Sequence, residues 1–599
     1  MKQLLYIFLA LLLTGITACE SVLDKDPIDS ISSSDYWTSA RDLELYVNQF
    51  YPTLPGISGY NEGTASWDLN SDSYIPGRGY NSRLNGEVTV YDASGWNYGN
   101  IRKVNYFIEN YTKATGQQND IDHFVGEAYF FRAKFYFELM QRFGEVPFIG
   151  KVLNLDSPEL YDPRTARNDL ADSIIEDLDL AISKMKDRSN APSHRLTKEV
   201  AMLYKTRVAL YEGTWEKYHE GTPYGVKDAN PEKYFNQVVE TGEALMNLGT
   251  CALLNTGNPE SDYHNLFSHG TSYDGVSEVL MWKKYDVELG ITHNIQRYLQ
   301  SEGVNFNGIS KRMIDTYLDI DGKPIDSRLD VPTSDMPNGG SKFVDYTSMT
   351  SILKNRDPRL SQTVAHEGVV LVEREENTIF KMPTLFGDNA EMASATGFNT
   401  MKGLDTDRYQ GSDNSHNSGT TATICYRYAE ALLNYAEAKA ELGQLDATAM
   451  AKSVNLLRNR VGMPNMTISS SSWYLKDELG VTAAVGAVRR ERTVELALEG
   501  FRFNDLMRWR AGRIIKGYIP KGTQYTGSDY DGKYMDDSEN NIEDLNRVDS
   551  NGFIDPYHET ISSNGGYQFD ESKDYLMPVP QDQIVKNPNL TQNPGYPGL

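Results

Sequence analysis

Three glutamates in the last quarter of the chain have a spacing that could support acid and base chemistry. Glu491, Glu495 and Glu499 recur at every fourth residue, which places all three on one face of a helix. Paired carboxylates serve as the acid and the base of glycosidases. The same stretch also contains five arginines: Arg489, Arg490, Arg492, Arg502 and Arg508. We therefore interpret the glutamates as members of a structural ion-pair network and predict no catalytic residue, with a surface glycoside hydrolase kept as an alternative.

Metal and cofactor chemistry has little support in the sequence. The nine histidines are scattered, and the chain contains no HExxH motif, no GxSxG motif and no phosphate-binding glycine loop. Asp549 to Asp555 place oxygen-bearing side chains at alternate positions, as a calcium loop does, but they lack its full spacing and its terminal glutamate. We interpret this stretch as an Asn-Gly turn. The sequence thus predicts no cofactor and no metal, and a structural calcium at the turn stays open.

Aromatic and polar residues are interleaved between residues 60 and 98, a stretch without helical periodicity. Sugar binding needs ring faces for C–H surfaces, and it needs amides, carboxylates or guanidinium groups for hydroxyls. Because the stretch lies between two helical segments, we expect its rings to be exposed. Trp67, Tyr74 and Tyr80 are the first candidate ligand-binding residues, whereas Trp96 directly precedes a helix and is interpreted as a packing residue.

A second candidate set lies further along the chain. Trp282, Tyr285 and Tyr298 occur close to Asn294 and Arg297, so this stretch also offers rings together with polar groups. We predict that these three aromatic residues belong to a ligand-binding surface. The sequence does not identify which of the six aromatic candidates form that surface.

The first residues have the features of a bacterial lipoprotein signal. Lys2 supplies a positive charge, and the apolar run Leu4–Leu13 is shorter than the roughly 20 residues of a membrane-spanning helix. The four residues that end at Cys19 match a lipobox. We predict that residues 1–18 are a signal peptide, that Cys19 is lipidated, and that residues 19–30 form a tether. The alternative is a plain secretory signal with a chance cysteine.

Composition restricts the partners. The formal net charge of the 599 residues is −25, which disfavours binding to the phosphate backbone of nucleic acid. Tyrosine is abundant, with 38 residues, and its ring and hydroxyl suit recognition surfaces. Cys251 and Cys425 form no metal-binding pattern. We expect them to be small buried side chains and not a disulfide.

Helical periodicity dominates the rest of the chain. Apolar residues recur at steps of three and four, as in Phe124, Ala128, Phe131, Phe135 and Leu139. The segments predicted to be helical are Arg41–Tyr51, Ile101–Thr115, Ile121–Gly144, Asn168–Asp187, Leu196–Trp215, Pro231–Leu248, Ala422–Leu442 and Asp446–Val461. They follow one another in hairpin-like pairs and have small residues at contact positions, as tetratricopeptide-like pairs do, although the strict repeat signature is absent.

These patterns divide the mature chain into three parts. Residues 31–252 are predicted to form an N-terminal helical scaffold that includes the candidate loop 60–98. Residues 253–421 are rich in Gly, Asn, Ser, Asp and Tyr and have only short strand-like runs, such as Val369–Glu373. We predict an irregular, loop-rich insert there, which for its length is expected to be functional. Residues 422–599 complete the chain with further helices and a C-terminal region.

A series of motifs, in order along the chain, resembles the SusD/RagB family. They are Leu23-Asp24-Lys25-Asp26-Pro27, Glu127–Ala133 with Phe143-Gly144-Glu145-Val146-Pro147, Asp319–Pro324, Asn355–Leu360, Tyr426–Ala438, Glu491–Gly500 with Arg502, Asp505, Arg508 and Trp509, Leu576–Pro580, and Gln592–Tyr596. The resemblance covers nearly the whole mature chain. It implies a mainly α fold, in which four tetratricopeptide-like helix pairs form a scaffold, with a large irregular insert and a few short strands.

The resemblance also implies a function. We expect a cell-surface glycan-binding lipoprotein, held at the outer membrane through Cys19, that delivers oligo- or polysaccharide to a SusC-like TonB-dependent transporter. A peptide-binding uptake lipoprotein of the same fold is the main alternative. A tetratricopeptide-like scaffold without a small ligand is a further one. No nucleic-acid partner is expected.

Overall fold

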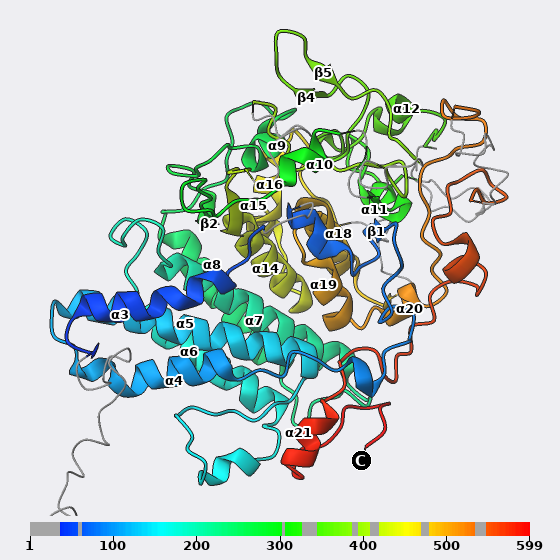
Figure 1. The fold of residues 1–599 in the computed structure, drawn as a ribbon. Coiled ribbons are helices and arrows are strands. Elements are labelled where there is room, and N and C mark those ends of the chain that lie inside the picture. Colours follow the sequence, from blue (N-terminus) through cyan, green and yellow to red (C-terminus); the bar gives the residue numbers. More distant parts are fainter. Residues whose placement is uncertain are drawn as a thin grey trace, which may run out of the picture.

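The computed structural model describes residues 36–57, 63–301, 303, 306–325, 344–385, 393–407, 418–468, 479–533 and 547–598. In this part of the chain the fold is mainly helical, as predicted. Figure 1 shows a lower layer of long N-terminal helices and an upper region of loops, short helices and small sheets, with C-terminal helices between them. The boundaries of the three parts expected from the sequence stay predictions.

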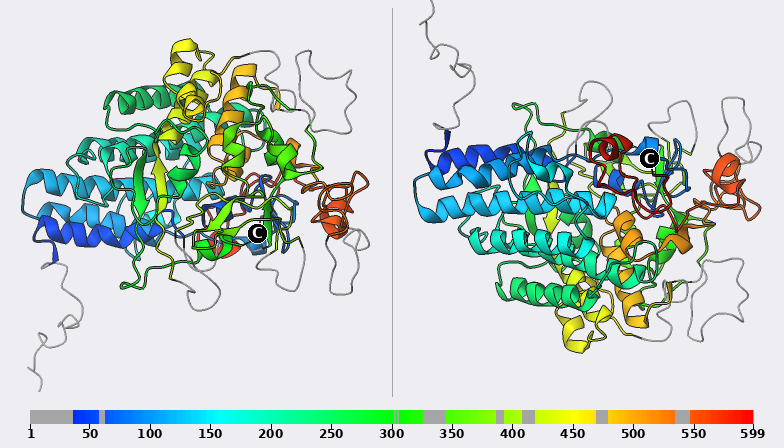
Figure 2. Two further views of the ribbon diagram at one scale, coloured as in Figure 1. Left: turned by 90° about the horizontal axis from the view of Figure 1, so that it is seen from above. Right: turned by 90° about the horizontal axis from the view of Figure 1, so that it is seen from below.

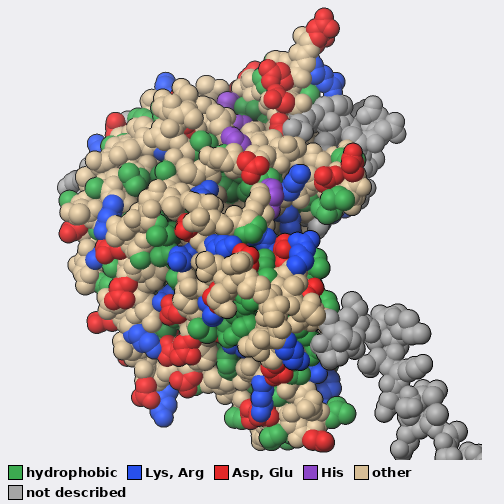
Figure 3. All heavy atoms as spheres, turned by 90° about the vertical axis from the view of Figure 1, so that its left-hand side faces the viewer, with side chains coloured by type: hydrophobic (Ala, Val, Ile, Leu, Met, Phe, Trp, Pro, Cys, Tyr) green, Lys and Arg blue, Asp and Glu red, His purple; other side chains and the backbone are tan. Residues whose placement is uncertain are grey.

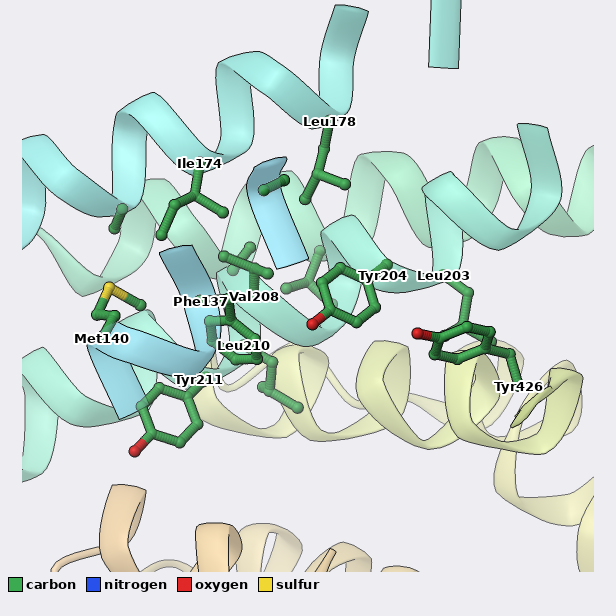
Figure 4. Close-up of a cluster of buried hydrophobic side chains, with 14 of the residues drawn as sticks. Phe137, Met140, Ile174, Leu178, Leu203, Tyr204, Val208, Leu210, Tyr211 and Tyr426 are labelled. Carbon is green, nitrogen blue, oxygen red and sulfur yellow. The ribbon is translucent and has the colours of Figure 1, made fainter. Parts of the chain in front are cut away.

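The lower layer is built from long helices. They are α3 (Ala40–Val47), α4 (Gly99–Asn110), α5 (Gln118–Phe143), α6 (Arg167–Lys184), α7 (Lys198–His219) and α8 (Pro231–Asn247). Successive helices from α5 to α8 pack on one another. In Figure 4, Phe137 and Met140 of α5, Ile174 of α6 and Val208 of α7 converge on one buried cluster. The periodic apolar residues of the sequence therefore form the core of this layer.

The ends of these helices agree with the sequence signals. Helix α5 ends before Gly144, whose φ of 73° is a conformation that glycine adopts without strain. Helix α8 begins at Pro231, and the side chain of Asn230 accepts a hydrogen bond from the backbone of Lys233.

The C-terminal part contributes a second group of helices. They are α14 (Tyr428–Glu441), α15 (Ala447–Ala451), α16 (Val454–Arg460), α18 (Ala483–Glu495), α19 (Arg502–Arg508), α20 (Gly512–Ile515) and α21 (Gln581–Lys586). Helix α14 packs against α7, α8 and α18, so it joins the lower layer to the C-terminal helices.

Two predicted helices differ from the structure. The first residues of the segment Ala422–Leu442 form strand β6 (Thr423–Arg427), because their β-branched and aromatic side chains pair with strand β2 (Val279–Lys283). The segment Asp446–Val461 is divided into α15 and α16 by a turn at Lys452 and Ser453.

The upper region is tied to the scaffold by short antiparallel strands. Strand β1 (Tyr74–Pro76) pairs with β3 (Asn307–Ile309), and β2 pairs with β6. Strand β4 (Val370–Val372), inside the predicted run Val369–Glu373, pairs with β5 (Thr378–Ile379). The first two pairings bring segments more than 100 residues apart into contact. In the left view of Figure 2, the green strand β2 lies beside the yellow strand β6.

Short helices complete the upper region and its connections. The α-helices are α9 (Asp262–Phe267), α10 (Ile295–Leu299), α11 (Lys311–Thr316), α12 (Met349–Leu353) and α13 (Pro358–Ser361). The 3₁₀ turns are η2 (Asn48–Thr53), η3 (Gly63–Asp68), η4 (Val90–Asp92), η5 (Tyr111–Lys113) and η6 (Pro158–Tyr161), and η10 (His558–Ser562) is a π-helical turn. The turn η3 carries Trp67, which lines the cavity described below.

Candidate functional site

A cavity of about 460 Å³ lies where the lower layer meets the C-terminal helices and the upper region. Its walls come from α5, α7, β6, α14 and α19, together with the segment 53–57 and the turn η3. Cavities of this size hold small organic ligands, and their walls usually combine rings with a few placed polar groups. We take it as the candidate functional site.

Trp67 is the predicted aromatic residue that reaches this cavity. It lies on η3, is half-buried, and packs over Gly500. A Cβ atom at Gly500 would stand 2.8 Å from the Cβ atom of Trp67, and the φ of Gly500 is 81°. Glycine is therefore required at position 500, and its lack of a side chain lets the tryptophan lie against the backbone.

The residue after Trp67 fixes the turn to helix α19. The carboxylate of Asp68 accepts hydrogen bonds from the backbone N–H groups of Gly500 and Arg502, both at 3.2 Å. Burial raises the pKa of Asp68 to about 7, because the hydrogen bonds offset only part of the lost solvation. Burial also acts on Asp72, but there the Arg502 guanidinium prevails and lowers the pKa to about 2.

Arg207 lines another part of the cavity and contacts three aromatic rings. Arg207 donates to both carboxylate oxygens of Glu430, from Nε at 2.6 Å and from Nη2 at 2.7 Å. Its guanidinium lies 5.1 Å from the ring centre of Tyr204, 5.2 Å from that of Tyr426 and 5.1 Å from that of Phe501. Burial lowers the pKa of Arg207, but the Glu430 carboxylate outweighs burial and raises it. Arg207 is thus a fixed cation with its planar faces against rings.

Figure 4 shows how two of these rings come from different elements. Tyr204 of α7 and Tyr426 of β6 lie side by side within the buried cluster. The buried hydroxyl of Tyr426 has no hydrogen-bond partner among the described residues. Burial raises the pKa of Tyr426 well above 10, so the hydroxyl keeps its proton. A cavity wall therefore contains a hydroxyl that can still donate a hydrogen bond.

Lys402 closes another part of the wall. Its Nζ atom donates to the Tyr263 hydroxyl at 2.8 Å, to the carbonyl of Ala497 at 2.7 Å and to Glu499 at 2.7 Å. Burial lowers its pKa to about 8, although the Glu499 carboxylate acts in the opposite direction. All three ammonium hydrogens are used within the protein, so Lys402 has a structural role here.

The more exposed polar groups at the cavity are one ion-paired carboxylate and two neutral amides. Glu138 of α5 has a side chain that is 54% exposed and pairs with Lys134 at 2.6 Å. Gln141 and Asn504 are half-buried and line the same cavity. These groups offer both donors and acceptors, which is the chemistry that a hydroxyl-rich neutral ligand requires.

The glutamates at four-residue spacing form the predicted ion-pair network. Glu495 is fully buried and accepts from Arg359 at 3.0 Å, from Arg427 at 2.8 Å and from Arg460 at 2.8 Å. Glu491 pairs with Arg359, and Glu499 pairs with Arg427, each at 2.7 Å. The interpretation of this motif as structural is confirmed.

Four of the predicted aromatic candidates are buried, and for Tyr74 the expectation of an exposed ring is wrong. Relative exposure is 0% for Tyr74, 2% for Tyr298, 3% for Tyr285 and 8% for Trp282. Tyr74 and Trp282 lie in paired strands, where one face of each strand turns inward. The Tyr285 hydroxyl donates to the carbonyl of Ile57 at 2.9 Å, and Tyr298 lies in helix α10.

Tyr80 lies apart from the cavity. It is half-buried, its hydroxyl donates to Glu87 at 3.0 Å, and its ring meets that of Tyr557 edge to face at 6.1 Å. The structure thus brings Trp67, and not Tyr80, to the cavity. Tyr204, Arg207 and Tyr426 were not among the predicted site residues, because Tyr204 and Arg207 fall in a segment predicted to be a core helix and Tyr426 falls in a motif that was noted only for the family resemblance.

In the described part of the chain, no group of three or more His, Cys, Asp or Glu side chains is arranged to hold a metal ion. The residues that resemble part of a calcium loop form a turn, in which Gly552 has a φ of 83° and donates its N–H to Asp549. Lys521 pairs with Asp549 at 3.2 Å and with Asp555 at 2.7 Å. The Asn-Gly turn is confirmed, and a lysine occupies the position between the carboxylates.

The remaining cysteines agree with the sequence interpretation. Cys251 and Cys425 are free thiols, half-buried and buried respectively. The signal peptide 1–18, the tether 19–30 and Cys19 lie outside the described residues, so these predictions stay predictions. Within the described helices, none combines the length and apolar character needed to cross a membrane.

Comparison with known families covers nearly the whole chain. The sequence model of the SusD family matches residues 278–596. A second family model, described as starch-binding and associating with the outer membrane, matches residues 23–210. A SusD-like protein of Formosa agariphila is 24% identical over 623 residues, which span 100% of both chains.

Solved structures have the same fold. A SusD-like protein of Bacteroides fragilis superposes with a TM-score of 0.68 and 23% identity, over 96% of this chain and 100% of that one. A SusD-like carbohydrate binding protein of the same species superposes with a TM-score of 0.69 and 22% identity, over 93% of this chain and 100% of that one. The chain belongs to the SusD family.

Proposed function

We propose that the protein is a cell-surface lipoprotein that captures oligo- or polysaccharide and delivers it to a SusC-like TonB-dependent transporter. The observation that carries the proposal is the position of Trp67, half-buried at the wall of a cavity whose carboxylates are paired with Lys or Arg side chains. A sugar ring can stack its C–H face on the indole, while its hydroxyls exchange hydrogen bonds with the surrounding side chains.

The polar contacts in this proposal come from separate elements. Glu138 and Gln141 of α5 and Asn504 of α19 can bind hydroxyls near the more exposed part of the cavity. Tyr426 contributes its ring to the cavity wall, and its hydroxyl is buried behind that wall. Tyr80 remains a separate candidate contact on the surface.

Relatives support this ligand class. One structural neighbour is described as a carbohydrate binding protein, and one matching family is described as starch-binding and associating with the outer membrane. The lipobox ending at Cys19 supports a lipid anchor, which would hold the protein beside a membrane transporter.

We propose that the protein does not cleave its ligand. The carboxylates that line the cavity are engaged by cations: Glu430 by Arg207, Glu499 by Arg427 and Lys402, and Asp505 by Arg492. The pKa of Glu499 is lowered, because Arg427 and Lys402 outweigh the effect of burial. A glycosidase acid needs the opposite shift, a raised pKa that keeps its proton.

The test is affinity electrophoresis of the mature, lipid-free protein across a panel of polysaccharides, with product analysis of the same samples. We expect retardation on at least one glycan without release of products. Trp67→Ala should weaken that retardation by about tenfold or more, because a stacking face worth about 1–3 kcal/mol is removed. Tyr91→Ala is the control, because Tyr91 is 89% exposed and lies outside the cavity.

Other outcomes would redirect the proposal. Release of oligosaccharide products would contradict the claim that the protein is not an enzyme. Binding to peptides together with indifference to every glycan would favour a peptide-uptake lipoprotein of the same fold. Equal binding by wild type and Trp67→Ala would leave glycan binding standing and reject this cavity as its site.

A further inference from the structure

The charged side chains at the cavity differ widely in how far they are exposed. Of those that the described residues contribute to its walls, Glu138 is the most exposed, at 54%, and Arg207 follows at 20%. The side chains of the others are at most 9% exposed. A ligand that enters the cavity therefore meets the charges of Glu138 and Arg207 before any other.

Glu138 presents a carboxylate to the ligand, although it belongs to an ion pair. Its Oε1 atom accepts from the Nζ atom of Lys134 at 2.6 Å, and the side chain of Lys134 is only 4% exposed. The pair is neutral as a whole, but its negative end is the exposed one. The charge reaches the cavity wall: burial raises the pKa of Tyr204, and the Glu138 carboxylate raises it further.

Arg207 offers the opposite chemistry. Glu430 takes its Nε and Nη2 atoms, so Nη1 is the nitrogen left to donate to a ligand. The side chain of Glu430 is 1% exposed, and this pair therefore exposes its positive end. The two ion pairs together offer one exposed acceptor and one exposed donor.

The other cations in the walls have no part in this recognition, because they are buried and bound to carboxylates of the protein. Lys402 and Arg427 bind Glu499, and Arg492 and Arg508 bind Asp505. Lys283 is not one of the lining residues, and its Nζ atom donates to the carbonyls of Pro52 and Leu54. An anionic ligand thus finds one exposed cation, Arg207, which already has a carboxylate partner.

Charged and uncharged glycans differ in how they meet these two groups. A sugar hydroxyl can donate to Glu138 or accept from Arg207, so an uncharged glycan satisfies both. A carboxylate or sulfate group can accept from Arg207, but it has no hydrogen to give to Glu138 and is repelled by it. The net charge of −25 adds repulsion during the approach.

We propose that the cavity takes uncharged glycans and that Glu138 is the specificity-determining residue that excludes acidic ones, those with uronate or sulfate groups. The inference rests on the proposed function, because it concerns the glycan that the cavity captures. It also assigns a consequence to Arg207: once the charge of Glu138 is removed, the arginine remains as a donor for an anionic group.

The experiment uses the full-length protein in mild detergent and a panel with neutral and acidic polysaccharides. The neutral member that binds most tightly is then lightly substituted in two ways, with hydroxyethyl groups or with carboxymethyl groups. The two substituents are similar in size and differ in charge. Titration calorimetry at low salt should give a dissociation constant about tenfold or more higher for the carboxymethyl form. Raising the salt should narrow this difference, because exposed charges are screened.

Glu138→Gln tests the residue itself, because it removes the charge and keeps the size of the side chain. The ratio of the two dissociation constants should fall by about threefold or more. Both constants are measured on the same variant, so a change in overall affinity cancels in the ratio. Glu176→Gln on α6 is the matched control, because Glu176 is exposed and lies outside the cavity, and it should keep the wild-type ratio. If Glu138→Gln fails to fold, Lys134→Met combined with Glu138→Gln tests the same charge without an unpaired lysine.

The outcomes distinguish this inference from the proposed function. Equal binding of both derivatives by wild type, or binding to acidic polysaccharides alone, would overturn the exclusion and leave glycan capture intact. A difference that salt does not narrow would show that charge is not its cause. An unchanged ratio in Glu138→Gln would reject Glu138 as the residue responsible. No binding to any polysaccharide would overturn the proposed function and this inference with it.

Discussion

At the scale of single residues, the candidate site depends on a few positions where the backbone and a side chain constrain each other. Trp67 lies against the backbone of Gly500. The carboxylate of Asp68 accepts hydrogen bonds from the backbone N–H groups of Gly500 and Arg502. Neither constraint is visible in a single sequence. Gly500 belongs to a motif that was quoted for its glutamates, and the contact that requires the glycine comes from a residue more than 400 positions earlier.

Gly500→Ala should therefore lower both stability and glycan binding. The added Cβ meets Trp67 in a backbone conformation that disfavours L-residues by about 1–2 kcal/mol. Gly443→Ala is the control, because Gly443 has a φ of 70° and open space around it, so the substitution adds strain without a collision. Urea unfolding of the two variants should show a larger loss for position 500; equal losses would mean that the contact with Trp67 is unimportant.

His219 should make stability depend on pH. It is buried, it stacks on Trp215 at 4.0 Å, and burial lowers its pKa to about 3. Because the folded pKa lies below the unfolded value near 6.5, its contribution is fully present above pH 6.5 and is lost progressively as the pH falls toward 3. Urea unfolding at several pH values should show a steeper loss between pH 6.5 and 4 for wild type than for His219→Asn. Parallel curves would contradict this role.

At the scale of elements, buried ion pairs join helices that are distant in sequence. Glu437 of α14 accepts from Arg508 of α19 at 2.7 Å on both oxygens, and from the indole N–H of Trp509 at 2.7 Å. Burial opposes its ionisation, yet the Arg508 guanidinium lowers the pKa of Glu437 to about 2. This contact fixes α19, and with it Asn504 and Asp505 at the cavity, against the helical scaffold.

Removal of Glu437 should be strongly destabilising. Glu437→Ala leaves the buried guanidinium of Arg508 without this partner, a type of change that costs about 3–5 kcal/mol. Glu240→Ala on α8 is the control, because Glu240 is exposed, and it should change the free energy of unfolding by less than about 0.5 kcal/mol. Denaturant unfolding of both variants measures the difference, and a loss at position 437 no greater than that of the control would reject the contact as a major link.

Periodicity explains how far the sequence could predict these elements. The long helices were predicted within a few residues, because Phe124, Phe131 and their equivalents repeat at helical spacing over many turns. Strand β6 was missed because its five residues run directly into α14, and only pairing with β2 separates them. The burial of Tyr74 and Trp282 could not be predicted for the same reason: short strand pairings between distant segments decide which rings are covered.

At the scale of the whole molecule, surface charge limits how the protein can attach to a membrane. Figure 3 shows Lys and Arg side chains across the middle of one face and acidic side chains over its lower part. The net charge of −25 is thus spread over a mixed surface and not gathered in one patch on this face. Such a surface gives little attraction to anionic lipid, so attachment to a membrane must come from elsewhere.

Cys19→Ser should release the protein from the membrane. If Cys19 is lipidated, the wild type will incorporate labelled fatty acid and sediment with outer membranes, because acyl chains supply the membrane affinity. The serine variant should lose the label and appear in the soluble fraction. Cys251→Ser is the control, since Cys251 is a half-buried free thiol that should leave both readouts unchanged. Membrane association of an unlabelled Cys19→Ser protein would show that contacts other than lipid suffice.

The walls of the cavity come from positions as far apart as Thr53 and Arg508. Contacts of such long range form late in folding, after the entropy of closing very large loops has been overcome. A fragment that lacks any part of residues 53–508 lacks part of the walls, so the complete site forms only when most of the chain has folded. Ligand binding at this cavity is therefore also a measure of completed folding, and the time at which a newly made molecule first binds its ligand gives the time at which its folding ends.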